Sequence, residues 1–240
     1  MSETLFDIQY KKLVNTILEQ GKIVESRNGK TLQIPYYSFT IENNDLPLYS
    51  NECSLTMRKM FYNGVRGEFK TLIDPTPLTN VSQFEANGCN YWRPWAAEDG
   101  SINVDYHNML HPRLEQLLND IKKDPFSRRH LINLWNQEHV DSGELSLPCC
   151  WYSMQFIVMP RGELHMVWNQ RSVDVAVGLP SDVMLARYFL QYVADRTELK
   201  PMSLHFNLAN VHIYSEHLTQ IVDMLQSPDS SKVIKFKIKE

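Results

Sequence analysis

The stretch from residue 130 to residue 215 constrains the fold more than any other part of the sequence. Its apolar residues recur at the short spacing of half-buried β-strands. The predicted strands are the runs HLINLW, SMQFIVM, ELHMVW and SLHFNLANVHIY. Arg161-Gly162, between the second and third runs, is typical of a hairpin turn. This part of the chain therefore predicts β structure.

Helices are predicted before, between and after these strands, from apolar residues at helical spacing. They cover residues 7–20, 113–123, 181–194 and about 216–226, with Pro180-Ser181 expected to cap the third. Residues 31–42 indicate a further β segment, 51–71 fit a helix only loosely, and 72–81 indicate a loop. No repeat, low-complexity segment or linker divides the chain, so we expect one α+β domain over residues 1–240.

Composition narrows the class of protein. The chain has 240 residues, 43% hydrophobic and 22% charged, which is ordinary for a globular enzyme. Its net charge of -4 argues against a protein that coats nucleic acid. The N-terminus does not resemble a signal peptide, and no apolar run approaches the roughly 18 residues of a membrane span. The four cysteines lack the spacing of a zinc site or a disulfide scaffold, so we expect a cytoplasmic protein with reduced thiols.

The most informative local feature pairs a thiol with a cation. Cys149-Cys150 precedes one predicted strand, and Gln170-Arg171-Ser172 follows the next, one hairpin later. A soft nucleophile near a fixed cation suggests chemistry on a phosphorylated molecule. Taken singly, each residue has an ordinary explanation, because free cysteines are usually buried small hydrophobes and a lone arginine is usually a surface residue.

Other candidates have similar alternatives. We place Asp182 in the first turn of the helix after Pro180-Ser181, where the helix dipole alone accounts for a carboxylate. His212 and Tyr214 alternate along a strand and share a face, but they are also explained as packing residues. Trp92 and Trp95 fit the core, and Glu68 fits a surface salt bridge. No cluster has metal-ligand spacing, and we predict no metal.

In combination, ordered motifs resemble those of the thymidylate synthase superfamily over nearly the whole chain. The matching segments are Asp124-Pro125-Phe126-Ser127-Arg128-Arg129, Leu147-Pro148-Cys149-Cys150-Trp151, Gln170-Arg171-Ser172-Val173-Asp174, Gly178-Leu179-Pro180 and Asn210-Val211-His212-Ile213-Tyr214. Upstream, Tyr91-Trp92-Arg93-Pro94-Trp95 is similar to a Tyr-containing family motif, Arg27 falls at the N-terminal phosphate arginine and Glu68 at the catalytic glutamate. The family's folate-side tryptophans have no clear counterpart. The resemblance implies a mixed sheet covered by helices and a homodimer formed through the sheet.

Departures from the family pattern carry the functional information. Asp182 stands where thymidylate synthases have Asn, and a carboxyl group suits the N4 amino group of cytosine, as Asp and Glu do in DNA recognition. In this the chain is similar to the phage deoxycytidylate hydroxymethylases. Trp151 replaces a His that this branch does not keep. Residues 233–240 end the chain at a point where thymidylate synthases continue with an apolar lid, and we expect a shorter lid to favour attack by water. Asn210 replaces an Asp, and nothing in the sequence explains this.

The resemblance implies a reaction and a role for each residue. The Cys150 thiolate adds to C6 of a pyrimidine nucleotide, C5 takes the methylene group of 5,10-methylenetetrahydrofolate, and water gives 5-hydroxymethyl-dCMP. Arg171 both lowers the thiol pKa and binds phosphate. Its expected partners at the phosphate are Gln170, Ser172 and Arg27, with Arg128 and Arg129 acting in trans from the second subunit. Glu68 and Tyr91 serve proton transfer, Asp182 reads the base, His212 and Tyr214 hold the sugar, and Asp174 and Gly178 lie on the folate side.

Several alternatives remain open at this level. A dCMP methyltransferase would use the same residues with tetrahydrofolate as hydride donor. A CMP hydroxymethylase is compatible because no residue settles the 2′ position. Thymidylate synthase activity and an inactive nucleotide-binding or RNA-binding homolog are disfavoured, the second because Cys150, Glu68 and the arginines are present. The role of Cys149 is open.

Overall fold

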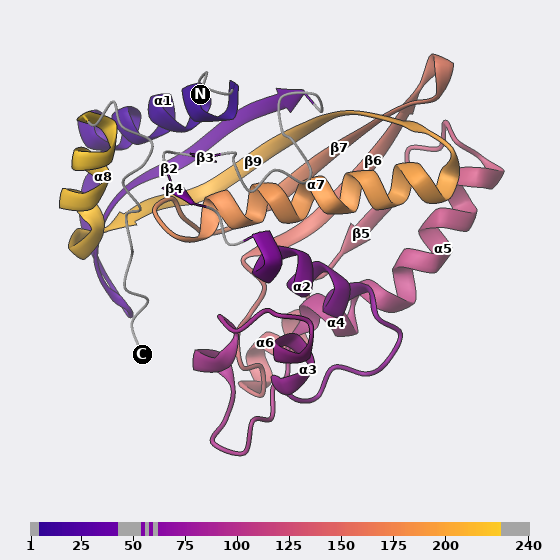
Figure 1. Ribbon diagram of the computed structural model, residues 1–240, viewed down its shortest axis with the longest axis horizontal. Helices are drawn as coiled ribbons and strands as arrows, with labels where there is room; N and C mark the ends of the chain where they lie inside the picture. The colour runs from indigo at the N-terminus through magenta and orange to yellow at the C-terminus, as the bar shows by residue number, and fades with distance from the viewer. Residues whose placement is uncertain (1–4, 43–53, 56–57, 60–61, 227–240) are drawn as a thin grey trace.

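The chain folds around one mixed β-sheet (Figure 1). The computed structural model describes residues 5–42, 54–55, 58–59 and 62–226. The strands are β1 (Lys22–Ser26), β2 (Gly29–Glu42), β5 (Leu131–Asn133), β6 (Trp151–Met159), β7 (Glu163–Gln170), β8 (Val173–Asp174) and β9 (Lys200–Tyr214), with β3 (Ser54–Leu55) and β4 (Arg58–Lys59) pairing separately. The order in the sheet is β1-β2-β9-β7-β6-β5, and β8 pairs with β9.

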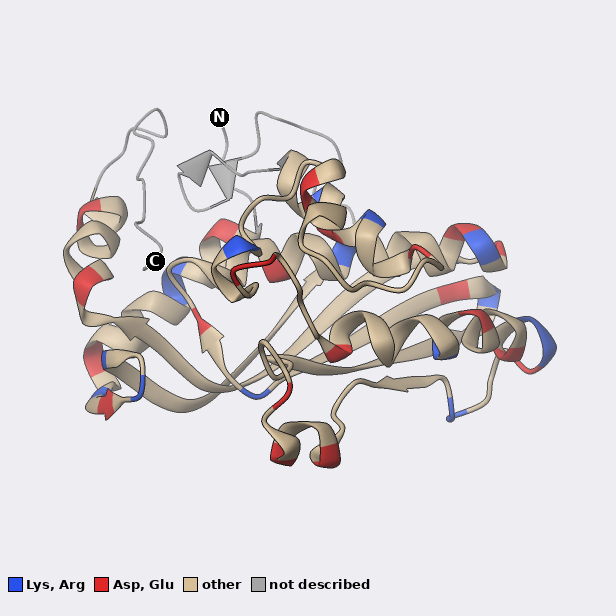
Figure 2. Cartoon of the chain, turned by 90° about the horizontal axis from the view of Figure 1, so that it is seen from below, with Lys and Arg blue, Asp and Glu red and all other residues tan. Residues whose placement is uncertain are grey.

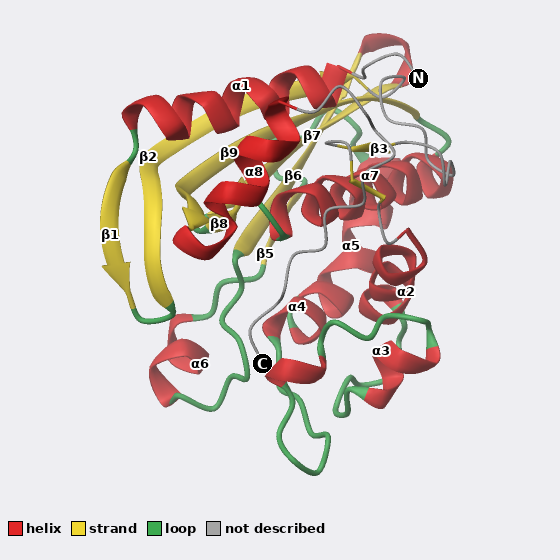
Figure 3. Cartoon of the chain, turned by 60° about the vertical axis from the view of Figure 1, so that its left-hand side comes forward, coloured by secondary structure: helices red, strands yellow, loops and turns green. Residues whose placement is uncertain are grey.

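The helices are α1 (Leu5–Gln20), α2 (Tyr62–Ile73), α3 (Ser82–Ala86), α4 (Asp105–Asn108), α5 (Leu110–Lys123), α6 (Gln137–Ser142), α7 (Gly178–Thr197) and α8 (Leu218–Gln226). Short 3₁₀ turns lie at Arg93–Trp95, Pro160–Gly162 and Ser215–His217. α1 and α7 lie across one face of the sheet, and α2 and α5 pack against α7 (Figures 1 and 3). The predicted α+β class and the mixed sheet covered by helices are confirmed.

The crossover through α7 brings the ends of two parallel strands together. β7 and β9 pair in parallel, and α7 connects them, as parallel neighbours require. β8 continues the pairing of the C-terminal part of β7 along β9 with the same register, and Arg171 and Ser172 interrupt the ladder between the two strands. The side chains that leave the sheet at this interruption therefore lie next to the start of α7.

Some predicted boundaries were wrong. The helix expected at 181–194 begins three residues earlier, at Gly178, and its N-cap residue Val177 provides no side-chain hydrogen bond. Pro180-Ser181 is therefore inside the helix and not its cap. Part of the ambiguous segment 51–71 is helical from Tyr62 onward, and β1, α3, α4 and α6 were not anticipated. The predicted hairpin turn is confirmed: Arg161 and Gly162 have φ of 71° and 74°, as a tight turn between twisted strands requires.

The two faces of the sheet differ in chemistry. The helix-covered face carries the buried core, in which Phe39 stacks on Phe206 with ring centroids 4.9 Å apart. The opposite face presents large side chains to solvent, including Tyr36 with 77% of its surface exposed. A hydrogen-bonded row of polar side chains crosses the strands there: Thr40, His205, Asn207, Asn169 and Ser153.

Charges are distributed without a dominant sign. On the side seen in Figure 2, Lys and Arg residues are scattered among Asp and Glu residues. This mixture agrees with the net charge of -4 and gives no support for a phosphate-backbone binding face on that side. Within the described residues, no helix combines the length and the apolar character needed to cross a bilayer.

Candidate active site

Cys150 lies at the start of β6, where the strand is irregular. Trp151 pairs with Gln170 and Ser153 with Asn169, so β6 holds one extra residue in a bulge directly after the cysteine. The backbone N–H of Arg171 donates to the carbonyl of Cys150 at 2.8 Å. The Cys150 N–H donates to the hydroxyl of Tyr106. Cys150 is half-buried while Cys149 is 1% exposed, so Cys149 and not Cys150 is the small buried hydrophobe.

The Arg171 side chain wraps around the loop that carries the cysteines. Its Nε donates to the carbonyl of Cys149 at 2.7 Å, and an Nη donates to the carbonyl of Pro148 at 3.1 Å. The guanidinium lies over the ring of Trp135, 5.2 Å from its centroid. A guanidinium has five N–H donors, so donors remain for an anionic ligand beside Cys150. The expected proximity of thiol and cation is present.

The pKa of the Cys150 thiol is raised above its ordinary value. Burial is the largest cause, and the nearby Asp182 adds to it. Arg171 and a hydrogen bond with Tyr106 act in the opposite direction. The influence of Arg171 on the thiol pKa thus has the expected sign but does not outweigh burial.

Asp182 lies inside α7 and not in its first turn, which corrects the sequence-based placement. Stabilisation by the helix dipole is therefore weaker than expected, because that effect fades beyond the first turn. Its Oδ2 accepts a hydrogen bond of 2.7 Å from Nε2 of Gln170. Burial, with smaller contributions from Glu68 and Asp174, raises the pKa of Asp182 to about 8. The carboxyl group is consequently mostly neutral at pH 7.

Glu68 is a buried acid and not a surface salt-bridge partner. It lies on α2 with 7% of its surface exposed. Tyr91 donates to its Oε2, and the indole of Trp92 donates to its Oε1 at 2.9 Å. Burial raises the pKa of Glu68 to about 7, although both hydrogen bonds lower it. The group is therefore balanced between acid and base near neutral pH.

The end of β9 brings His212 and Tyr214 to the same site. Their rings meet edge to face at 5.2 Å, and Asp174 pairs opposite His212. Burial raises the pKa of Asp174, and His212 and His217 oppose this. Oδ1 of Asp174 accepts from the N–H groups of Ala176 and Val177. Within the described residues its Oδ2 makes no hydrogen bond and can accept from a ligand.

Asn210 has a structural explanation in its backbone. Its φ is 44°, a left-handed conformation that Asn tolerates better than most residues, and His212 Nδ1 lies within hydrogen-bond distance of its carbonyl and side-chain oxygens. It sits on β9 opposite the interruption between β7 and β8. Asn210 therefore helps to orient the imidazole of His212.

The remaining predicted residues lie at the edges of this cluster. Ser172 and Gly178 flank Asp174, and a side chain at Gly178 would only just contact Asp182 and Asp174. Arg27 is exposed in the β1–β2 turn, whose Asn28 hydrogen-bonds Tyr214. Arg128 and Arg129 are exposed between α5 and β5, and in the described part of this subunit they make no side-chain contact with the cluster.

Sequence reasoning missed Tyr106, Trp135 and Trp168 and left Trp92 in the core. Trp92 is indeed buried and stacks on Phe84 at 5.0 Å, but it also donates to Glu68. Trp95, by contrast, is 39% exposed and was wrongly assigned to the core. The role of Tyr106 follows from the burial of its hydroxyl group, and that burial depends on tertiary contacts that the sequence does not show.

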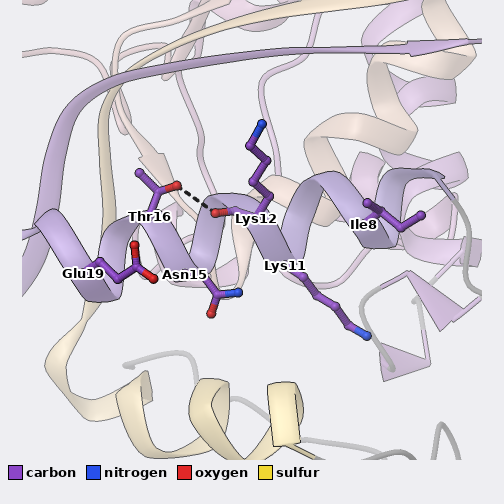
Figure 4. A pocket seen from close by; sticks show the side chains of 6 residues that line it. All are labelled: Ile8, Lys11, Lys12, Asn15, Thr16 and Glu19. Carbon is purple, nitrogen blue, oxygen red and sulfur yellow. Dashed lines mark hydrogen bonds between the residues drawn. The ribbon is translucent and has the colours of Figure 1, made fainter.

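Another hollow lies on α1, lined by Ile8, Lys11, Lys12, Asn15, Thr16 and Glu19 (Figure 4). Thr16 there donates to the carbonyl of Lys12 at 2.8 Å, an ordinary contact within a helix. None of its residues belongs to the cluster around Cys150. Among the described residues, no group of His, Cys, Asp and Glu side chains is arranged to hold a metal ion.

Comparison with known proteins identifies the family of the chain. The thymidylate synthase family model matches residues 8–240. The chain therefore belongs to the thymidylate synthase family, whose members are one-carbon transferases that act on pyrimidine nucleotides. Family members use 5,10-methylenetetrahydrofolate as co-substrate.

Individual relatives are moderately similar over most of their length. The thymidylate synthase of Mesoplasma florum is 28% identical over 252 residues, covering 91% of this chain and 85% of that protein. Thymidylate synthase 1 of Bacillus spizizenii is 27% identical and covers 91% of this chain and 82% of its own. The solved structure of thermostable thymidylate synthase A from Bacillus subtilis superposes with a TM-score of 0.80 at 24% identity, covering 93% and 85%. This last match supports the fold.

Proposed function

We propose that this enzyme transfers a one-carbon unit to C5 of dCMP and, with water, forms 5-hydroxymethyl-dCMP and tetrahydrofolate. The observation that carries the proposal is the position of Asp182, whose buried carboxyl group accepts a hydrogen bond from Gln170 within the cluster that contains Cys150. The family relatives named above are thymidylate synthases, so the choice of base is the point at which this chain departs from them.

A neutral carboxyl group fits the edge of cytosine better than that of uracil. Cytosine presents an N4 amino donor and an unprotonated N3 acceptor, whereas uracil presents an O4 acceptor and an N3–H donor. One oxygen of Asp182 can accept from N4, and its proton can be given to N3. Because the pKa of Asp182 is about 8, this proton is present at pH 7.

Cys150 acts as the nucleophile that attacks C6. Cys150 is half-buried, unlike the buried Cys149, and Arg171 and Tyr106 favour its thiolate. Phosphate bound beside Arg171 would be held by the guanidinium donors that the Pro148 and Cys149 carbonyls do not use. Arg27, Ser172, His212 and Tyr214 complete the binding of phosphate and sugar in the proposal.

Glu68 acts as the acid and base at C5 and directs the attacking water. With a pKa of about 7 it exchanges protons readily at neutral pH, as general catalysis requires. Tyr91 and Trp92 hold both of its oxygens in place. Trp151 supports hydroxymethylation because it is buried against Trp168, with ring centroids 4.4 Å apart, and offers no imidazole beside Cys150. The expected short lid, residues 233–240, lies outside the described residues.

The active species in this proposal is a homodimer formed through the open face of the sheet. That face carries Tyr36, Ile157 and the polar row from Thr40 to Ser153, which a second copy would cover. The exposed positions of Arg128 and Arg129, away from the cluster of their own subunit, support a role at the phosphate of the partner subunit. We place the enzyme in the cytoplasm, where reduced thiols such as Cys150 persist.

The test is mass spectrometry of the products after incubation with 5,10-methylenetetrahydrofolate and equimolar dCMP, CMP and dUMP. A hydroxymethyl group on dCMP alone supports the whole proposal. A methyl group on dCMP would support recognition of cytosine by Asp182 but would show that the last step is not attack by water. Product on CMP would show that the enzyme accepts ribose. Product on dUMP alone would refute the proposed recognition of cytosine by Asp182.

A further inference from the structure

A chain of hydrogen bonds behind the base-reading residue begins at a tryptophan. The indole Nε1 of Trp168 donates to Oε1 of Gln170 at 3.2 Å. Nε2 of Gln170 donates to Oδ2 of Asp182 at 2.7 Å and to the carbonyl of Ser172 at 3.2 Å. Trp168 and Gln170 are two residues apart on β7, so both side chains lie on the face covered by α7.

The donor at Trp168 and the acceptor at Ser172 fix the direction of these hydrogen bonds. An indole N–H can only donate a hydrogen bond, and a backbone carbonyl can only accept one. The Gln170 amide must therefore direct its oxygen to Trp168 and its NH₂ group to Ser172 and Asp182. Oδ2 of Asp182 is consequently obliged to accept.

We propose that Trp168 is a positioning residue that sets base specificity by holding the Gln170 amide in this orientation. The inference rests on the proposed function, in which Asp182 gives its proton to N3 of cytosine. If the amide were reversed, its oxygen would face Asp182 and accept that proton. The carboxyl group would then have no donor left for N3.

Burial makes the indole necessary for this orientation. Trp168 is 0% and Gln170 is 2% exposed, so water cannot replace the indole N–H. Without it, Oε1 loses its donor, and a buried polar atom without a partner is unfavourable. Among the described residues, the Ser172 carbonyl then remains the single contact that opposes rotation of the Gln170 amide.

The experiment compares Trp168→Phe with Trp151→Phe as a matched control. The rings of the two tryptophans contact each other in the same buried cluster, and both changes replace an indole by a phenyl ring. Trp151 makes ring contacts with Tyr106, Trp168 and Phe189 but no indole hydrogen bond within the described residues. Dissociation constants for dCMP and dUMP, measured by calorimetry without folate, give the preference of each protein for the base.

Trp168→Phe should reduce the preference for dCMP over dUMP about tenfold, the effect of one buried hydrogen bond, while Trp151→Phe changes it less than twofold. Equal effects of both variants, or no effect of Trp168→Phe, would overturn the proposal. If Trp168→Phe does not fold, benzothienylalanine at position 168 keeps the bicyclic ring, lacks only the N–H and should give the same tenfold loss.

The experiment distinguishes failure of the inference about Trp168 from failure of the proposed function. Should the unmodified protein prefer dUMP, the proposed function fails, yet a change in the ratio confined to position 168 still supports the orienting role of the indole. If the unmodified protein prefers dCMP and the ratio of the two dissociation constants does not change when the indole N–H is removed, the proposed function stands. The inference about Trp168 is then refuted.

Discussion

The protonation state of Asp182 gives a prediction that can be worked out in numbers. We expect dCMP to bind less tightly as the pH rises through the pKa of Asp182, which is about 8. The sign follows from the mechanism, because the neutral acid is the form that donates to N3 and it is lost on deprotonation. At pH 7 about nine-tenths of Asp182 is neutral, and at pH 9 about one-tenth. The Kd for dCMP should therefore rise about tenfold between these values.

The assay is a calorimetric titration of dCMP at pH 7, 8 and 9, in a Cys150→Ala background that removes the thiol from the titration. Asp182→Asn in the same background is the control, because an amide does not ionise in this range. Glu68 and Asp174, which both influence the pKa of Asp182, are present in both proteins and their effects cancel in the comparison. The Asn variant should change less than twofold.

Two results would refute this reasoning. A Kd for dCMP that is constant from pH 7 to pH 9 would show that binding does not need the proton of Asp182. An equal rise in the Asp182→Asn protein would assign the proton to another group. A phosphate effect is already excluded by the range, because the second ionisation of a phosphomonoester, near pH 6, is nearly complete at pH 7.

Four further outcomes follow from the same site. Cys150→Ala should reduce turnover at least 1000-fold, on the order expected for loss of a nucleophile, while calorimetry shows nucleotide binding retained. Asp182→Asn should shift the ratio of kcat/KM for dCMP over dUMP toward dUMP by about 10- to 100-fold, measured by competition. Glu68→Gln should lower kcat about 100-fold or more and abolish the rise in kcat as the pH increases through about 7. Arg128→Ala and Arg171→Ala subunits, each weak alone, should regain activity in verified mixed dimers, and a lack of recovery there counts against a shared site.

Local pattern was sufficient to predict much of the fold. The apolar spacing in α1, α5 and α8, and the strands β6, β7 and β9, are set mainly by which residues face the core, and these predictions were confirmed. The start of α7 was not predictable in this way. Pro180 and Ser181 are typical of a helix start, but tertiary contacts with β7 and β8 extend the helix back to Gly178.

Site residues whose chemical type determines their role could be predicted from the sequence. Residues whose role depends on their position in the folded structure could be predicted less well. Motif matches found Cys150, Arg171, Asp182 and Glu68, and the structure brings these residues together. The supporting contacts of Tyr106 and Trp168 come from chain segments far apart in the sequence or from the orientation of a buried ring. A linear pattern does not contain that information.

In the proposed function the two buried acids of the site, Glu68 and Asp182, have different tasks, and the surroundings of each acid suit it to its task. Glu68 receives hydrogen bonds on both oxygens, from Tyr91 and Trp92, and these hold its pKa near 7 against burial. Asp182 receives one from Gln170, and its pKa remains higher, at about 8. The negative charge of Glu68 raises the pKa of Asp182. Ionisation of Glu68 therefore helps to keep the carboxyl group of Asp182 neutral. The lower pKa of Glu68 therefore suits proton transfer, and the higher pKa of Asp182 suits recognition of cytosine at the same pH.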